Sequence, residues 1–257
     1  MSNIAKAFQN GKAFIGFVTG GDPSIGKTKE FVLEMLHAGA DLIEIGIPFS
    51  DPIAEGPVIQ EANIRALSAG ATVEKLFVLV EDIRKLSAVP IVFLTYLNPV
   101  FHFGYDAFFK RCNIAGLDGI IIPDLPFEEQ AEVREVASKY GVDIISLIAP
   151  TSEARIKEIA KTASGFIYLV SSMGVTGVRS DITTDIDSIT SSIRGVTKLP
   201  VAVGFGIHTS AQAAQMARSA DGVIVGSAIV KIIAEHGEGA GPHIHQYVRE
   251  MKEAISK

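Results

Sequence analysis

The 257-residue sequence is poor in cysteine and has no tryptophan. Its one cysteine, Cys112, forms no disulfide within the chain, which favours a reducing, cytoplasmic location. Cys112 lies in a helix-like run, where a small buried hydrophobic residue is the expected role. The N-terminal stretch lacks the apolar core of a secretory signal, and no apolar run is long enough to span a bilayer. We therefore expect a soluble cytoplasmic protein that does not enter a membrane.

Positive charge is also scarce, since 23 Lys and Arg face 29 Asp and Glu and the net charge is −6. This balance argues against binding to nucleic acid or to an anionic membrane, because both favour a basic surface. Hydrophobic residues make up 47% of the chain and charged residues 20%, which excludes disorder and supplies a large core. Zinc-like cysteine spacing, a Walker A motif and a Ser-His-Asp pattern are lacking. His243 and His245 have no third ligand nearby in the sequence, so a surface pair is the expected role.

Apolar, β-branched runs recur along the whole chain, as in a parallel sheet that is buried on both faces. Helical spacing separates them, most clearly in the stripe Val73, Leu76, Phe77, Val80 and Ile83. The eight runs are FIGFVTG (14–20), DLIEIGI (41–47), PIVFLTY (90–96), GIIIPDL (119–125), DIISLIAP (143–150), FIYLVSS (166–172), PVAVGFG (200–206) and GVIVGSA (222–228).

Eight strand–helix units in a chain of this size predict a closed (β/α)8 TIM barrel, with an open doubly wound sheet as the alternative. No linker or low-complexity segment interrupts the units, so residues 1–257 are interpreted as one domain. We expect extra helices at the N-terminus and in the long loop after the second strand, near 58–69. The loop after the sixth strand is rich in Gly and Ser. Barrel enzymes place their chemistry in the loops at the carboxyl ends of the strands.

Glu44 lies inside the second apolar run, where an unpaired carboxylate is costly. Strand alternation places Ile43, Ile45 and Ile47 toward the helices, and therefore Glu44 into the barrel near its mouth. A structural ion pair is the competing interpretation, but no other expected strand carries Lys or Arg in its core. Glu44 is therefore predicted to be a working acid or base, with a pKa raised by burial.

Three further acids follow strands. Asp51 and Glu55 lie in the loop after the second strand, where either is a solvated loop acid or a helix cap on the simplest interpretation. The sequence SDP favours a turn or cap for Asp51, whereas Glu55 is free to swing over the mouth. Asp124, after the fourth strand, is a third candidate, although a hydrogen-bonded turn residue explains it equally well. Tyr168 faces inward by alternation with Phe166 and Val170, and its hydroxyl needs a partner at the mouth.

Glycine clusters follow the last three strands, at 174–177, at Gly204-Phe205-Gly206, and at Gly226-Ser227. Glycine lets backbone N–H groups approach an anion, and a helix starting at Ser227 would add its positive dipole end. Barrel enzymes frequently bind phosphate between the loops after strands seven and eight. The clusters therefore predict a phosphate site that needs no Lys or Arg, although tight turns explain each cluster taken alone.

The sequence resembles the tryptophan synthase α-chain family over nearly its whole length. The resemblance lies in seven blocks that have the family's order and spacing. They are FVTGGDPS, DLIEIGIPFSDPIAEGPVIQEAN, TYLNPVFHFG, GIIIPDLP, YLVSSMGVTGVR, GFGI and DGVIVGSAIV.

This resemblance implies a carbon–carbon lyase that cleaves indole-3-glycerol phosphate into indole and glyceraldehyde 3-phosphate. Glu44 matches the first catalytic carboxylate of the family, and the second lies in the loop after the second strand. The lid residue Thr176 would bond that second carboxylate. The resemblance also implies that the substrate contacts Phe17, Ile59, Leu94 and Tyr168 around the indole and Gly177, Gly206, Gly226 and Ser227 at the phosphate.

One position departs from the family, whose loop usually reads A-D-G-P where this chain has A-E-G-P. Glu55 thus stands at the place of the second catalytic Asp, with its carboxylate one methylene further out. Either the pocket accommodates Glu55, or the chain is a catalytically weak subunit that mainly activates its partner. A different phosphate-binding barrel, such as an isomerase or epimerase of phosphosugars, is a further alternative.

The resemblance also implies a partner, a β-chain that carries pyridoxal phosphate (PLP), in an αββα complex through which indole passes. No cofactor is expected in this chain itself. The segment NPVFHFG after the third strand, with Phe101, His102 and Phe103, either contributes to the partner surface or covers the barrel rim.

Overall fold

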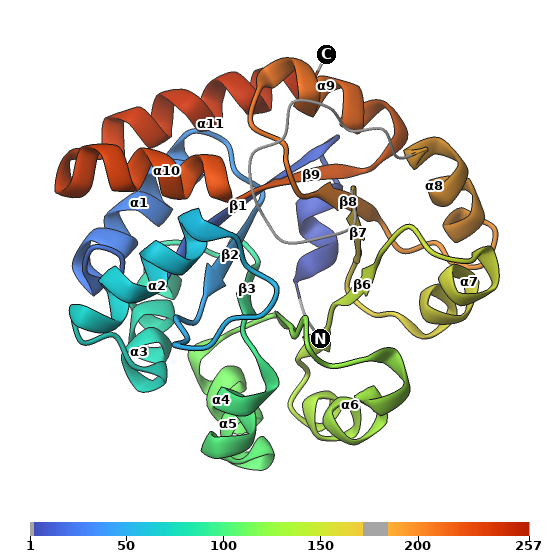
Figure 1. Ribbon diagram of the computed structural model, residues 1–257, viewed down its shortest axis with the longest axis horizontal. Coiled ribbons are helices and arrows are strands. Elements are labelled where there is room, and N and C mark those ends of the chain that lie inside the picture. Colours follow the sequence, from blue (N-terminus) through green and yellow to red (C-terminus); the bar gives the residue numbers. More distant parts are fainter. Residues whose placement is uncertain (1–2, 172–184, 257) are drawn as a thin grey trace.

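A parallel β-sheet encircled by helices forms the body of the molecule, as the computed structural model shows in Figure 1. The structure describes residues 3–171 and 185–256. Within these residues the strands are β1 (Ala13–Thr19), β2 (Leu42–Gly46), β3 (Ile91–Leu94), β4 (Gly119–Ile121), β5 (Asp143–Ile144), β6 (Ser146–Ile148), β7 (Ile167–Val170), β8 (Val201–Gly204) and β9 (Gly222–Val225).

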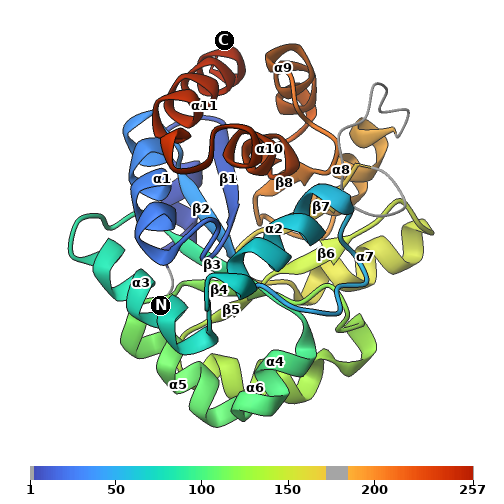
Figure 2. The ribbon, with the colours of Figure 1, turned by 60° about the vertical axis from the view of Figure 1, so that its left-hand side comes forward.

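Helices follow the strands and cover the outer face of the sheet (Figures 1 and 2). The α-helices of the described part are α1 (Ile25–His37), α2 (Pro57–Ser68), α3 (Val73–Arg84), α4 (Leu97–Phe103), α5 (Tyr105–Ala115), α6 (Gln130–Lys139), α7 (Glu153–Thr162), α8 (Ile186–Arg194), α9 (Ser210–Ser219), α10 (Ser227–His236) and α11 (Gly241–Ile255). Short 3-10 turns are η1 (Ile4–Phe8), η2 (Phe127–Glu129) and η3 (Gly237–Gly239). Across 3–171 and 185–256, no helix has the length and apolar character needed to cross a membrane.

The barrel nearly closes at the fifth apolar run. The strand order is β5-β4-β3-β2-β1-β9-β8-β7-β6, so the two strands at the ends of the sheet are neighbours in the sequence. Between them lies Ile145, whose N–H donates to the carbonyl of Ile120 (2.9 Å) and whose side chain packs inside the barrel. The run expected as one strand therefore forms two short ones, because β5 pairs with β4 while β6 pairs with β7. The predicted barrel is confirmed, and the open sheet is excluded.

Strand alternation divides the core into two layers, as the sequence predicted. Ile43, Ile45 and Ile47 belong to the layer between the sheet and the helices, whereas Leu42 packs inside the barrel. Tyr168 lies with the interior group, together with Phe166 and Val170.

The amino end of the barrel is filled by the N-terminal segment. Ile4, on η1, is fully buried and belongs to the interior core. A Cβ at Gly119 or Gly165 would lie 3.1 or 3.0 Å from the Ile4 side chain, so these glycines leave room for it. With this end filled, the only open end of the barrel interior in the described structure is at the carboxyl ends of the strands.

Three aspartates secure the amino ends of the strands in the same way. Asp41, Asp118 and Asp221 each stand one residue before a strand, at β2, β4 and β9. Each accepts the backbone N–H of a residue near the start of a neighbouring strand, namely Phe14, Ile91 and Val201. Each also binds a cation, which is Lys252, Arg84 and Arg194 respectively. These carboxylates tie adjacent strands and the helix layer together at the closed end.

We predict that Asp118→Ala destabilises the fold far more than Asp221→Ala. The Asp118 side chain is 4% exposed, and its loss leaves the Ile91 N–H without its acceptor and the Arg84 guanidinium without its counter-charge, at a cost of about 3–5 kcal/mol. The Asp221 side chain is 34% exposed and water replaces its bonds, so about 1 kcal/mol is expected. Equilibrium urea unfolding measures both, and equal losses would contradict the burial argument.

Candidate functional site

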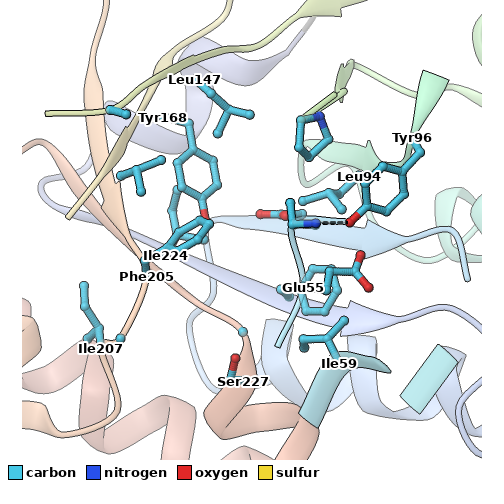
Figure 3. A pocket seen from close by; sticks show the side chains of 18 residues that line it. Glu55, Ile59, Leu94, Tyr96, Leu147, Tyr168, Phe205, Ile207, Ile224 and Ser227 are labelled. Atoms are coloured by element: carbon cyan, nitrogen blue, oxygen red, sulfur yellow. Dashed lines mark hydrogen bonds between the residues drawn. The ribbon is translucent and has the colours of Figure 1, made fainter. Parts of the chain in front are cut away.

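A cavity of about 270 Å³ opens at the carboxyl ends of the strands (Figure 3). It receives side chains from most of the barrel, as expected for the mouth of such a fold. Glu55, Tyr96 and Ile59 lie on one side of it, opposite Tyr168 and Phe205. The lining residues are Phe17, Glu44, Ala54, Glu55, Ile59, Leu94, Tyr96, Pro123, Leu147, Ala149, Tyr168, Val170, Phe205, Gly206, Ile207, Ile224, Gly226 and Ser227.

Glu44 points from β2 into this cavity and is 2% exposed. Among the described residues, its Oε2 has no hydrogen-bond partner and no Lys or Arg forms an ion pair with it. Burial raises the pKa of Glu44 to about 8, because the charged form loses its hydration without gaining a counter-charge. At neutral pH the side chain is therefore mostly a neutral acid that can both give and take a proton.

Glu55 lies in the loop between β2 and α2 and is 7% exposed. Its Oε2 accepts a hydrogen bond of 2.6 Å from the Asn63 side-chain amide. Burial raises the pKa of Glu55 to about 7, while hydrogen bonds from Asn63 and Tyr96 act in the opposite direction. The expectation that Glu55 swings freely is wrong for this structure, because a buried amide on α2 holds its carboxylate.

Tyr96 and α2 fix the loop that carries Glu55. The hydroxyl of Tyr96, which is 2% exposed, accepts the N–H of Ala54 (3.0 Å), and the Gln60 side chain donates to the carbonyl of Glu55 (2.7 Å). Sequence reasoning missed Tyr96 and Asn63. Asn63 does leave a signal, since it is the polar member of the buried stripe that α2 forms with Ile59, Ala62 and Ala66.

The rest of the wall is mainly apolar and includes several predicted contacts. Phe17 on β1 lies opposite Glu44 in the β1–β2 register. Its ring packs against Gly46, and a Cβ on Gly46 would lie only 2.7 Å from the ring. Tyr168 meets Phe205 edge to face, with ring centroids 6.2 Å apart. Burial, and then the charge of Glu44, raise the pKa of the Tyr168 hydroxyl, so it stays protonated. These rings form a slot that suits a flat aromatic group.

Glycines and a helix start form the polar end of the cavity. Phe205 has φ 76° and Gly206 φ 80°, so two consecutive residues adopt the left-handed region. For Phe205 this conformation is costly, and such strain is concentrated at functional sites. Ser227 is the first residue of α10, and Gly226 before it provides no side-chain cap. Both the free N–H groups and the helix dipole at this point favour an anion.

The structure brings most of the predicted site residues together at this cavity. Gly204 is the exception, because it does not line the cavity. A Cβ there would lie 2.5 Å from the Tyr168 hydroxyl, so Gly204 makes room for that ring. Thr176, which the resemblance assigns to a lid, and Gly177 lie outside the described residues.

The remaining candidates lie elsewhere. Asp51 is exposed and does not cap α2, whose cap residue is Gly56. Asp124 accepts the N–H of Leu97 (2.9 Å) and is therefore a hydrogen-bonded turn residue. Burial raises the pKa of the Cys112 thiol, as expected for a core residue.

The histidines near the C-terminus lie apart from the cavity. His245 contacts Glu34 (3.0 Å), and His243 stacks on His236. In the part of the chain that the structure describes, no group of three or more His, Cys, Asp or Glu is placed to hold a metal ion.

This arrangement combines two carboxyl groups that titrate near neutral pH, an apolar slot and an anion-binding end. Groups whose pKa values lie near the working pH are the most effective proton donors and acceptors. The cavity is thus suited to acid–base chemistry on an aromatic compound that carries a phosphate.

Known proteins resemble this chain along its full length. The family model described as "Tryptophan synthase alpha chain" matches residues 4–256. The tryptophan synthase alpha chain of Lacticaseibacillus casei is 50% identical over 255 residues, which cover 99% of this chain and 96% of the relative.

Two solved structures show the same similarity in three dimensions. Tryptophan synthase from Mycobacterium tuberculosis aligns with a TM-score of 0.90 at 33% identity, over 100% of this chain and 99% of that one. The tryptophan synthase complex from Pyrococcus furiosus contains a chain that aligns with a TM-score of 0.86 at 35% identity, over 95% and 99% of the two chains. With a cavity of this chemistry and similarity over its whole length, the chain belongs to the tryptophan synthase alpha chain family.

Proposed function

We propose that this chain, as one barrel domain spanning residues 1–257, is the lyase that cleaves indole-3-glycerol phosphate into indole and glyceraldehyde 3-phosphate. The observation that carries the proposal is the pair of carboxyl groups with raised pKa values, Glu44 and Glu55, on the wall of one apolar cavity. Family membership supplies the substrate, and the cavity supplies the groups that its cleavage requires.

The substrate orientation follows from the two ends of the cavity. The indole ring lies in the slot formed by Phe17, Ile59, Leu94, Tyr168 and Phe205, where its apolar faces are removed from water. The phosphate lies at Gly206, Gly226 and Ser227, where backbone N–H groups and the start of α10 favour an anion. Thr176 and Gly177 complete the proposed contacts.

Glu44 acts first as an acid and then as a base. In its neutral form it donates a proton to C3 of the indole ring, which leaves a positive charge shared with the ring nitrogen. The resulting carboxylate then accepts the proton of the substrate hydroxyl on the carbon bonded to C3, while the bond between that carbon and C3 breaks. The bonding electrons return to the ring, so indole and the aldehyde leave and Glu44 is again protonated.

Glu55 acts on the ring nitrogen. As a carboxylate it accepts a hydrogen bond from the indole N–H, and the attraction strengthens when the ring becomes positive. The alternative of a catalytically weak activator subunit is not favoured, because Glu55 keeps its carboxyl group on the cavity wall. The extra methylene of Glu55 does not move its carboxylate out of the cavity, because the hydrogen bond from Asn63 holds the carboxylate at the wall.

A β-chain partner is the second part of the proposal, in an αββα complex in which the β-chain carries PLP. Exposed apolar side chains lie near the mouth, with Ile53 73% and Phe101 68% exposed. They belong to two segments that the Tyr96–Ala54 hydrogen bond joins. An apolar surface beside the mouth is suited to a partner that receives indole, and Phe103, by contrast, packs against the core.

Replacing Glu44 by Gln should abolish indole release while leaving the substrate bound. Loss of a general acid–base group lowers kcat by about 10²–10⁴-fold, and the amide keeps the shape of the side chain. Steady-state assays of indole formation measure the loss, with Asp51→Asn, at an exposed acid in the loop that follows β2, as the control of unchanged rate. Retention of most of the activity by Glu44→Gln would refute the assignment.

The pH dependence of kcat/KM should be bell-shaped around neutral pH. Glu55 must be ionised, so activity rises with pH through its pKa of about 7. Glu44 must start protonated, so activity falls as pH rises through its pKa of about 8. Indole formation measured at constant ionic strength gives the profile. A rate that keeps rising above the pKa of Glu44 would show that Glu44 does not start as the acid.

Replacing Phe101 by Asp should weaken association with a β-chain without changing the rate of the isolated chain. A charge in the apolar surface is buried on docking, which is unfavourable. Calorimetric titration with the β-chain measures the affinity. Leu86→Asp is the matched control, because Leu86 is similarly exposed, at 61%, but lies before β3, at the closed end. Equal affinities of the two variants would place the partner elsewhere.

A further inference from the structure

We propose that Asn63 is the positioning residue of Glu55, in that its buried amide holds the longer carboxylate on the cavity wall in its charged form. The proposal rests on the proposed function only for what Glu55 does to the substrate. The hydrogen bond between Asn63 and Glu55 is present in the free protein, so its effect can be measured without substrate.

The contact is short and protected from water. The Asn63 Nδ2 donates to the Glu55 Oε2 over 2.6 Å, Asn63 is 3% exposed, and Glu55 is 7% exposed. Asn63 is the polar side chain on a helix face whose other buried residues are Ile59, Ala62 and Ala66. A buried amide on an apolar face is costly unless it is hydrogen-bonded, and Glu55 is the partner that the structure gives it.

The helix that carries Asn63 is held in place by a separate ion pair. Arg65 donates to both carboxylate oxygens of Asp22, over 2.9 and 2.8 Å, and the Asp22 side chain is fully buried. This bidentate pair joins α2 to the loop after β1. At the same loop, Gly21 has φ 94° and a Cβ on it would lie 2.5 Å from Ala71, so the loop and the end of α2 are in close contact. The register of α2, and hence the position of the Asn63 amide, is thereby fixed.

Within the described residues, no cation lies beside Glu55 that would stabilise its carboxylate in place of Asn63. The titratable groups facing it are Tyr96, after β3, and, across the cavity, Glu44 on β2 and Tyr168 on β7, while Asp124 faces Tyr96. None of these carries a positive charge. Burial raises the pKa of Glu55, and the Asn63 hydrogen bond is the largest of the effects that lower it again. An amide donor stabilises the carboxylate more than the neutral acid, so Asn63 keeps Glu55 ionisable at neutral pH.

The test is a titration of Glu55 in the full chain by NMR of ¹³C-labelled glutamate side chains, with Glu55→Gln to assign its signal. In Asn63→Ala, and in Asn63→Leu, which fills more of the volume, the titration midpoint should move upward by about 1 to 2 pH units. Indole release at pH 7 should then fall by about five- to fiftyfold, with the acid limb of the pH profile displaced by the same amount.

Gln60→Ala is the matched control, because Gln60 lies on the same helix and bonds the backbone carbonyl of Glu55 rather than its carboxylate. The Glu55 midpoint in Gln60→Ala should stay at the wild-type value. In Asn63→Gln, which keeps an amide donor, the midpoint should lie closer to the wild-type value than in Asn63→Ala. Thermal melting reports which variants are folded.

An unchanged midpoint in a folded Asn63 variant would overturn the proposal, whatever reaction the protein catalyses. Loss of the fold in both Asn63→Ala and Asn63→Leu would also overturn it, because Asn63 would then be a structural residue. If instead the midpoint moves but wild-type protein releases no indole, the positioning role stands and the proposed function fails.

Discussion

A carboxyl group without a counter-charge, at the mouth of an apolar barrel, is the constraint on which the site depends. Glu44 is buried on the inward face of β2, and the described residues around it provide no cation. The folded state therefore binds a proton that the unfolded chain releases above its usual pKa of 4.5. The folded state is therefore favoured at low pH, where Glu44 is neutral in both states. Stability declines as pH rises from 4.5 toward 8, because the unfolded chain then releases a proton that the folded state keeps. Favourable interactions elsewhere in the barrel, such as those at the closed end, must offset this cost of burying Glu44.

The two ends of the barrel thus have opposite character. At the amino end, three aspartates pair with backbone N–H groups and with cations, and Ile4 fills the interior. At the carboxyl end, Glu44 and Glu55 have no cation beside them among the described residues, Phe205 has an unfavourable backbone conformation, and α10 starts without a side-chain cap. The satisfied end gives rigidity, and the unsatisfied end leaves polar groups for a ligand.

Helix α2 connects these features because it is inserted between a strand and its covering helix. It provides Ile59 to the aromatic slot and Asn63 to Glu55, and its ion pair with Asp22 links it to the loop after β1. Under the proposed function, the glutamate at position 55 is therefore compatible with a working site. The extra length of the side chain is taken up inside the wall, where α2 supplies a donor.

The sequence by itself determined the features that depend on local periodicity. Alternation along 41–47 placed Glu44 inside the barrel, helical spacing located α3, and glycines marked the cavity end at Gly226 and Ser227. These succeed because side chains on a strand alternate faces whatever the strand packs against. The tertiary structure alone decided which distant groups meet. The split at Ile145, the place of Gly204 under Tyr168 and the Asn63–Glu55 bond follow from barrel closure and from the rotation of α2. Both are set by contacts between segments far apart in the chain, which the spacing of residues within one segment does not encode.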